Sequence, residues 1–165
     1  MTLPETIAAV NRRFPRVQVS EFRGQTRVVS ESESLYDFFA FLRNERGFDF
    51  LSDITCVDYL NYREATDRFG LVYILANTQA NERITVRIFL NEPDLVVRSV
   101  VPLWAGANWM EREVWDMFGI TFDGHPDHRR ILLPEEFTAF PLRKDYPLQG
   151  RGERHNFPVL TRSEA

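Results

Sequence analysis

The sequence predicts an α+β fold: a two-layer domain of helices packed on a mixed or antiparallel sheet, followed by a long extended C-terminal arm. Helix signals and strand signals do not alternate strictly along the chain, which disfavours a doubly wound parallel sheet. The connections between strand segments are short enough for antiparallel hairpins. After Phe122 the apolar residues follow no sustained period, so we place the globular domain at 1–121 and the arm at 122–165.

Cap and turn signals mark the first elements. Thr2-Leu3-Pro4-Glu5 has capping-box spacing with a proline in the first turn, which predicts a short helix to about Arg13. Alternation over residues 17–29, interrupted at Gly24, predicts a β-hairpin.

A helix is expected after the second capping box, Ser30-Glu31-Ser32-Glu33. Apolar residues then recur at the i, i+3, i+4 and i+7 positions of a helix, as Leu35, Phe38, Phe39 and Leu42. Gly47 is the expected end of this helix.

Three strands are predicted next, over Phe50 to Asp58, Phe69 to Asn77 and Ile84 to Leu90. Residues 71–76 are apolar at every position, which is typical of a central strand covered on both faces. The third segment alternates between apolar and polar residues, which indicates one polar face.

A further helix is predicted from about Pro102 to Phe118, ending at Gly119. Its apolar stripe is formed by Leu103, Ala107, Met110, Val114 and Met117, widened by Trp104, Trp115 and Phe118, with Asn108, Arg112 and Asp116 opposite. Glu111 falls in the aromatic flank, where a buried carboxylate needs a partner. We expect Glu111 to pair with an arginine, either Arg129, Arg130 or one on another chain. The alternative is that Glu111 is exposed to solvent at the edge of this flank.

Composition excludes several classes of protein. At 165 residues, with 44% hydrophobic and 27% charged residues, the chain has the usual mix of one soluble domain. The single cysteine, Cys56, rules out an internal disulfide and a cluster or zinc site built from several thiolates of this chain. Neither a signal peptide nor a stretch long enough to span a membrane is present, so we expect a cytoplasmic protein or one peripheral on the cytoplasmic side.

The segment after Phe122 combines five prolines with apolar residues and arginines. Exposed apolar side chains are a liability in water, so this segment must lie on something. Arginines and aromatic residues are enriched at protein interfaces, which favours a partner-binding arm. Two alternatives stay open: a belt folded back on the chain's own sheet, and a nucleic-acid-binding tail. The net charge of −4 and the acidic residues within the tail disfavour nucleic acid.

Three catalytic or ligand-binding interpretations find little support. His125-Pro126-Asp127-His128 could suggest a metal site, but no helix sets both imidazoles on one face and no third ligand is fixed nearby. The glycines in 150–154 lack the strand-to-helix turn of a phosphate loop. Glu111 and Glu113 would project about 200° apart on a helix, so they could not readily serve one substrate.

Two spaced motifs connect the last helix with the arm. In the first, Glu111-Arg112-Glu113 is followed by Asp116-Met117-Phe118, then His125, Arg129 and Ile131-Leu132. The second is Pro141-Leu142-Arg143-Lys144-Asp145-Tyr146-Pro147. On these residues the chain resembles the NADH-quinone oxidoreductase C-subunit family of respiratory complex I over nearly its whole length. It departs from the family pattern at Ala139-Phe140, where members often have Gly-His, and at His128, where they often have an apolar residue.

The resemblance implies a non-catalytic peripheral subunit of a proton-translocating NADH-quinone oxidoreductase, on the cytoplasmic side of the inner membrane. Its arm would lie along the quinone-site D-subunit, beside other peripheral-arm subunits. NADH, FMN, iron-sulfur clusters and quinone would be bound elsewhere in the complex, with no cofactor, metal or catalytic residue in this chain. The implied partner interface comprises Glu111, Arg112, Glu113, Asp116, His125, Arg129, Arg130, Pro141, Leu142, Arg143, Lys144, Asp145, Tyr146 and Pro147.

Related subunits also occur in ferredoxin-linked photosynthetic complexes and in membrane-bound hydrogenases, and the sequence does not separate these machines. A nucleic-acid-binding adaptor is the alternative from another class; a binding assay on a generic duplex at several salt concentrations would identify it.

Overall fold

The computed structural model describes residues 2–157. In chain order the elements are α1 (Leu3–Arg13), β1 (Gln18–Phe22), β2 (Gln25–Val29), α2 (Leu35–Arg46), β3 (Phe50–Asp58), β4 (Phe69–Asn77), β5 (Glu82–Leu90), β6 (Val96–Arg98), α3 (Ala107–Phe118), β7 (Thr121–Asp123) and the 3-10 helix η1 (Glu153–Asn156). The predicted α+β class is confirmed. So are the first helix, the hairpin, the second helix and the three long strands, the last of which starts two residues earlier than predicted.

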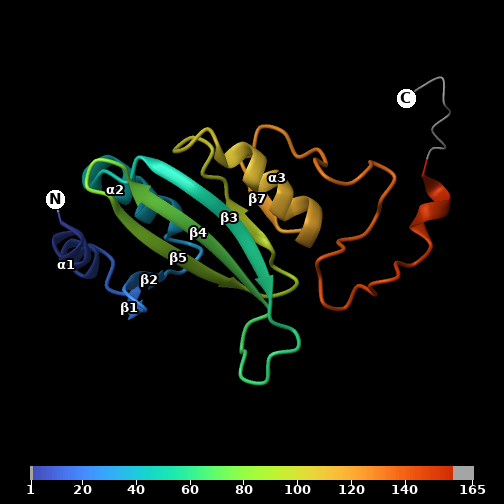
Figure 1. The fold of residues 1–165 in the computed structure, drawn as a ribbon, viewed down its shortest axis with the longest axis horizontal. Coiled ribbons are helices and arrows are strands. Elements are labelled where there is room, and N and C mark those ends of the chain that lie inside the picture. Colours follow the sequence, from blue (N-terminus) through green and yellow to red (C-terminus); the bar gives the residue numbers. More distant parts are fainter. Residues whose placement is uncertain (1, 158–165) are drawn as a thin grey trace.

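Five strands form a mixed sheet in the order β1-β2-β5-β4-β3. The strands β2 and β5 are parallel, and the other neighbours are antiparallel. A second, two-stranded parallel sheet pairs β6 with β7. Figure 1 shows α1 at one end of the molecule and α3 with the C-terminal arm at the opposite end.

The helix α2 packs on the sheet through its apolar stripe. Leu35, Phe38, Phe39 and Leu42 are fully buried. The ring of Phe39 lies 4.7 Å from that of Tyr73 on β4 and 5.7 Å from that of Trp104, between centroids. One aromatic cluster thus joins the sheet, α2 and the turn that leads into α3.

The last helix is shorter than predicted: α3 begins at Ala107, not near Pro102. The N–H groups of Leu103 and Trp104 both donate to the carbonyl of Val100, each at 2.9 Å, and close a separate turn. The indole of Trp104 donates to the carbonyl of Phe48 at 3.3 Å, which fixes this turn on the domain. The apolar residues before Ala107 therefore belong to a buried turn.

Two further local predictions need correction. The helix α2 starts at Leu35, after Ser34, so the predicted capping box at 30–33 does not cap it. Instead, the N–H of Ser30 donates to the carbonyl of Arg87 and continues the pairing with β5. The short strands β6 and β7 were not predicted, because three residues are too few to show a period. The strand β7 spans the predicted domain boundary, and its Phe122 is 1% exposed.

Gly119 should be intolerant of a side chain. It ends α3 with a φ of 76°, and a Cβ atom there would lie 2.6 Å from the ring of Phe140 in the arm. We expect Gly119→Ala to destabilise the chain by about 2 kcal/mol and lower its melting temperature by roughly 5 °C.

The matched control is Gly106→Ala. Gly106 precedes the same helix with helical backbone angles, and a Cβ atom there meets nothing within 4 Å. Equal melting temperatures for the two variants would contradict the expected role of Gly119.

Candidate functional site

The motif residues gather where the arm crosses α3. In Figure 1 the arm leaves β7 and runs past α3 before it turns away from the domain. The helix presents Glu111, Arg112 and Asp116 to the residues around it, and each of them forms hydrogen bonds within the chain. The site is therefore the attachment of the arm to the domain.

Asp116 is the central anchor of the arm. Its Oδ2 atom accepts hydrogen bonds from three successive backbone N–H groups, of Ile131, Leu132 and Leu133, at 3.0, 2.8 and 3.0 Å. Its Oδ1 atom accepts one from Nη1 of Arg130 at 2.5 Å. Burial by itself raises the pKa of Asp116, but these donors outweigh it and lower the pKa below the usual value. A fully buried carboxylate is thus held ionised by the arm that covers it.

Arg112 holds the same segment from the carbonyl side. Its Nε and Nη2 atoms donate to the carbonyls of Arg129 and Arg130, at 2.9 and 3.0 Å. One turn of α3 therefore offers an acceptor for the N–H groups of the arm and a donor for its carbonyls. Residues 129–133 follow the helix without forming a strand or a helix of their own.

Glu111 is fully buried, and within residues 2–157 its hydrogen-bond partners are Ser99 and Val100, so the predicted pairing with Arg129 or Arg130 was wrong. Its carboxylate accepts hydrogen bonds from the hydroxyl of Ser99 and the N–H of Val100, both at 2.7 Å. Burial raises the pKa of Glu111 to about 7, although both hydrogen bonds act to lower it. Glu111 therefore fastens the turn before α3 to the helix.

The two histidines bind backbone groups. His125 accepts a hydrogen bond from the N–H of Asp127 at Nδ1, so its Nε2 is the donor to the carbonyl of Asn108, at 3.1 Å. Nε2 of His128 lies 2.8 Å from the carbonyl of Phe122, and its ring packs on Trp115. Within residues 2–157, no group of three or more His, Cys, Asp or Glu side chains could hold a metal ion.

A second set of charges, here called the arm clasp, comprises Asp58, Arg68, Glu92, Arg143 and Asp145. Arg68, ahead of β4, pairs with Asp145 at 2.8 Å, with Glu92 at 2.7 Å and with Asp58 at 3.4 Å. Arg143 pairs with Glu92 at 2.8 Å.

In the arm clasp, Arg143 of the arm thus pairs with Glu92 of the domain, and Asp145 of the arm pairs with Arg68 of the domain. Burial by itself raises the pKa of Asp145, but the hydrogen bond and charge of Arg68 outweigh it and lower the pKa. Backbone bonds complete the contact. Nε of Arg143 donates to the carbonyl of Phe118 at 2.6 Å, and the N–H of Lys144 donates to the buried Asp58 at 2.8 Å.

The remaining expected interface residues differ in exposure. Glu113, Arg129, Leu142, Lys144 and Asp145 are exposed, whereas Glu111 and Asp116 are fully buried within the chain. The half-buried members are Arg112, His125, Arg130, Pro141, Arg143, Tyr146 and Pro147.

Sequence reasoning missed Ser99, Asp58, Arg68 and Glu92 as anchors. A serine before an apolar run, or a charge beside a strand, carries no local signal for a distant partner. The departures from the family pattern also have roles here, since Phe140 packs over Gly119 and His128 packs on Trp115.

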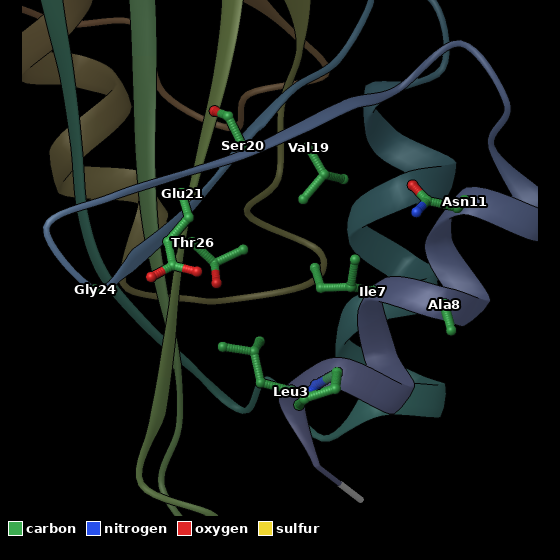
Figure 2. Close-up of a pocket in the computed structure, with 10 residues that line it drawn as sticks. Leu3, Ile7, Ala8, Asn11, Val19, Ser20, Glu21, Gly24 and Thr26 are labelled. Atoms are coloured by element: carbon green, nitrogen blue, oxygen red, sulfur yellow. The ribbon is translucent and has the colours of Figure 1, made fainter.

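A hollow on the domain lies apart from these residues. It has a volume of about 620 Å³ and is lined by Leu3, Ile7, Val19 and Thr26 among others. Figure 2 shows these side chains between α1 and the hairpin of β1 and β2. The lining of this hollow includes none of the motif residues of the described chain.

Asp116→Asn should release the proximal arm. An amide cannot neutralise Arg130, and breaking a buried pair typically costs about 3–5 kcal/mol. We expect the urea midpoint to fall and trypsin to cleave after Arg129 and Arg130 much faster. Asp123→Asn, an exposed change five residues from the helix end, is the control. Unchanged cleavage in Asp116→Asn would refute the anchoring role.

Glu111 should make stability depend on pH. Its folded pKa of about 7 exceeds the unfolded value of 4.5, so the folded chain binds the extra proton and stability is lost as pH rises through 7. Relative to Glu111→Gln, we expect the native chain to lose roughly 1 kcal/mol more between about pH 6 and 8.

The pKa of His125 is lowered, chiefly by burial, so its own effect is a loss of stability as pH falls, opposite in sign to that of Glu111. Its Nε2 atom lies 4.0 Å from the carboxylate of Glu111, so the comparison is made above pH 6, where the lowered pKa keeps the imidazole mostly neutral. Urea titrations at several pH values measure the difference. Glu113→Gln, an exposed change on the same helix, should leave the pH profile as it is. Parallel profiles for the native chain and Glu111→Gln would exclude a raised pKa.

Comparison with known proteins agrees with the motifs. The family described as "Respiratory-chain NADH dehydrogenase, 30 Kd subunit" matches residues 28–152. The NADH-quinone oxidoreductase C-subunit of Trichlorobacter lovleyi is 45% identical over 136 residues, which cover 82% of this chain and 83% of the relative. The C-subunit of Citrifermentans bemidjiense is 42% identical, with coverage of 87% and 89%.

Two solved structures share the fold. One is described as "Nqo5 of the trypsin-resistant fragment (1-134)"; it is 34% identical, with a TM-score of 0.71, and covers 77% of this chain and 99% of its own. A chain of the archaeal membrane-bound sulfane sulfur reductase has a TM-score of 0.77 over 96% of this chain and 93% of its own, and at 23% identity it shows a common fold alone. With the family match, the two C-subunit relatives and the Nqo5 fragment, the chain belongs to the NADH-quinone oxidoreductase C-subunit family, the 30 kDa subunits of the respiratory-chain NADH dehydrogenase.

Proposed function

We propose that this chain is a non-catalytic structural subunit of a proton-translocating NADH-quinone oxidoreductase, packed against the quinone-site D-subunit through its arm. One observation carries the proposal: the polar groups of the family motifs fasten the arm to α3 instead of converging on a cavity. Such an arrangement gives an arm a defined path, which is what a docking subunit requires.

The chemistry of the titratable groups supports a structural role. Burial raises the pKa of the only cysteine, Cys56, to about 12, so its thiol stays protonated and unreactive near neutral pH. Arg112 and His125 form their hydrogen bonds with backbone groups, and Asp116 accepts three from backbone N–H groups and one from the side chain of Arg130. We infer that NADH, FMN, iron-sulfur clusters and quinone are bound by other subunits.

The outward side of the arm suits a partner surface. Leu132 is 61% exposed and Leu142 is 52% exposed, although neighbouring backbone groups are fixed on α3. Trp109, at the start of α3, is also 61% exposed, with Arg112 5.3 Å from its ring centroid. Exposed apolar side chains on a fixed backbone, beside tryptophan and arginine, are typical of interface anchors.

The buried motif residues take an indirect part in this proposal. Glu111 and Asp116 have no surface to offer a partner in this conformation. Glu111 holds the turn before α3, and Asp116 holds the arm. The partner would contact the exposed residues that these two carboxylates keep in position, namely Glu113, Arg129, Leu142 and Lys144.

The relatives support an arm separable from the domain. The solved Nqo5 fragment is named as trypsin-resistant and matches 77% of this chain. We infer that this chain also has a protease-resistant domain followed by an arm that is cut more readily when no partner is bound. No helix of the described residues is long and apolar enough to cross a membrane. We propose that partner subunits hold the chain at the cytoplasmic side of the inner membrane.

Truncation after Phe122 tests the proposal. The shortened chain should still melt cooperatively, at a lower temperature because Asp116 loses its partners, and should no longer co-purify with the quinone-site subunit. Trypsin should cleave the arm in the isolated full-length chain and spare it in the complex. A truncated chain that does not fold, together with a resistant arm in the isolated protein, would instead establish the belt interpretation.

A further inference from the structure

Lys144 is the only lysine in a chain that has 20 lysine and arginine residues in all. In the sequence it stands between Arg143 and Asp145, two members of the arm clasp. Both neighbours turn their charges toward the domain, where they pair with Glu92 and Arg68. The side chain of Lys144 is exposed, and among residues 2–157 its ammonium group has no ion-pair partner.

The backbone around Lys144 is fixed on both sides. Two successive turns surround it, closed by hydrogen bonds from the N–H of Arg143 to the carbonyl of Phe140 and from the N–H of Tyr146 to the carbonyl of Arg143. The N–H of Lys144 itself donates to Asp58, whose side chain is fully buried. An exposed ammonium group thus projects from a backbone that is held by three hydrogen bonds.

An apolar side chain lies next to this charge. Leu142 is 52% exposed, while its N–H donates to the carbonyl of Met117 at the end of α3. The turns leave the side chains of both Leu142 and Lys144 exposed. The combination of one point charge and one apolar side chain on a preorganised backbone is suited to recognition.

We propose that the arm clasp presents Lys144 and Leu142 to a partner protein whose surface combines a carboxylate with an apolar pocket. This inference rests on the proposed function and adds the contact chemistry of the docking surface. The charge of Lys144 would pair with the carboxylate, and Leu142 would fill the pocket. The ion pairs of Arg68 and Arg143 fix the segment that carries Leu142 and Lys144. Lys144 is then the positive charge of this segment that a partner can bind.

A protein fits this surface better than an anionic membrane. Lipid binding needs clusters of basic residues, because each lysine or arginine contributes only about 1 kcal/mol near a charged membrane. Here one lysine stands beside Asp145 and Glu92, which are about half exposed, on a chain of net charge −4. One lysine therefore supplies too little attraction for a phosphate-rich surface, whereas a single carboxylate of a protein needs only one opposite charge.

The single lysine makes the test direct, since an amine-reactive reagent can modify only Lys144 and the N-terminal amine. We expect labelling of Lys144 to be about tenfold slower in the purified complex than in the isolated full-length chain, because a paired and desolvated amine is shielded. A zero-length carbodiimide coupling should join Lys144 to an aspartate or glutamate of a neighbouring subunit. Tandem mass spectrometry identifies both products.

Two variants separate the parts of the proposal. Lys144→Gln should leave the melting temperature of the isolated chain unchanged and should weaken its retention in the complex about tenfold as salt rises. Arg68→Gln keeps the lysine but opens the arm clasp, so carbodiimide coupling at Lys144 should fall. Arg63→Gln, an exposed change in the same loop as Arg68, is the control for both.

The outcomes also separate this inference from the proposed function. Equal labelling of Lys144 in the complex and in the isolated chain would overturn the inference while leaving membership of the complex intact. Protection by vesicles of anionic lipid alone, without partner subunits, would overturn it in favour of a membrane contact. Absence of the chain from the purified complex would overturn the proposed function as well.

Discussion

Three consecutive backbone N–H groups of residues 131–133 converge on one oxygen of Asp116, and Arg130 binds the other. A buried carboxylate is costly unless it is paired, so Asp116 and the arm stabilise each other. The path of the arm, the cover over α3 and the position of the arm clasp all follow from this contact. Arg112 completes it by binding the carbonyls of the same segment.

The spacing of the first motif reflects this geometry. Arg112 and Asp116 are four residues apart, which sets them on one face of α3, one turn apart. Glu111 precedes Arg112 and points to the other side, where Ser99 and Val100 bind it. Neighbouring motif residues therefore serve opposite surfaces of one helix: Glu111 fixes the helix on the domain, and the other two fix the arm on the helix.

Sequence patterns predicted the elements that have a period. The strands β3 and β4 have the predicted bounds, and α2 has the predicted apolar stripe, because burial selects residues at regular spacing. The helix α3 was predicted too long, since Leu103 and Trp104 are equally apolar in a buried turn. Three of the four groups that donate to the carboxylate of Asp116 are backbone N–H groups, which leave no trace in side-chain identity. The pairing of Arg68 with Asp145 joins residues far apart in the chain, so only the folded structure brings it to light.

Hydrogen bonds and ion pairs join the arm to the domain beside apolar packing of Leu133 and Phe140, whereas Leu132 and Leu142 stay exposed. Hydrogen bonds and ion pairs define a path but contribute little net free energy, because the unfolded arm exchanges them for water. Ordering each residue costs about 1–2 kcal/mol, and burial of apolar surface is the main source of compensation. In the isolated chain, buried carboxylates of the domain fix the position of the arm. Under the proposed docking role, a partner surface that covers its leucines would add the burial of apolar surface that these contacts lack.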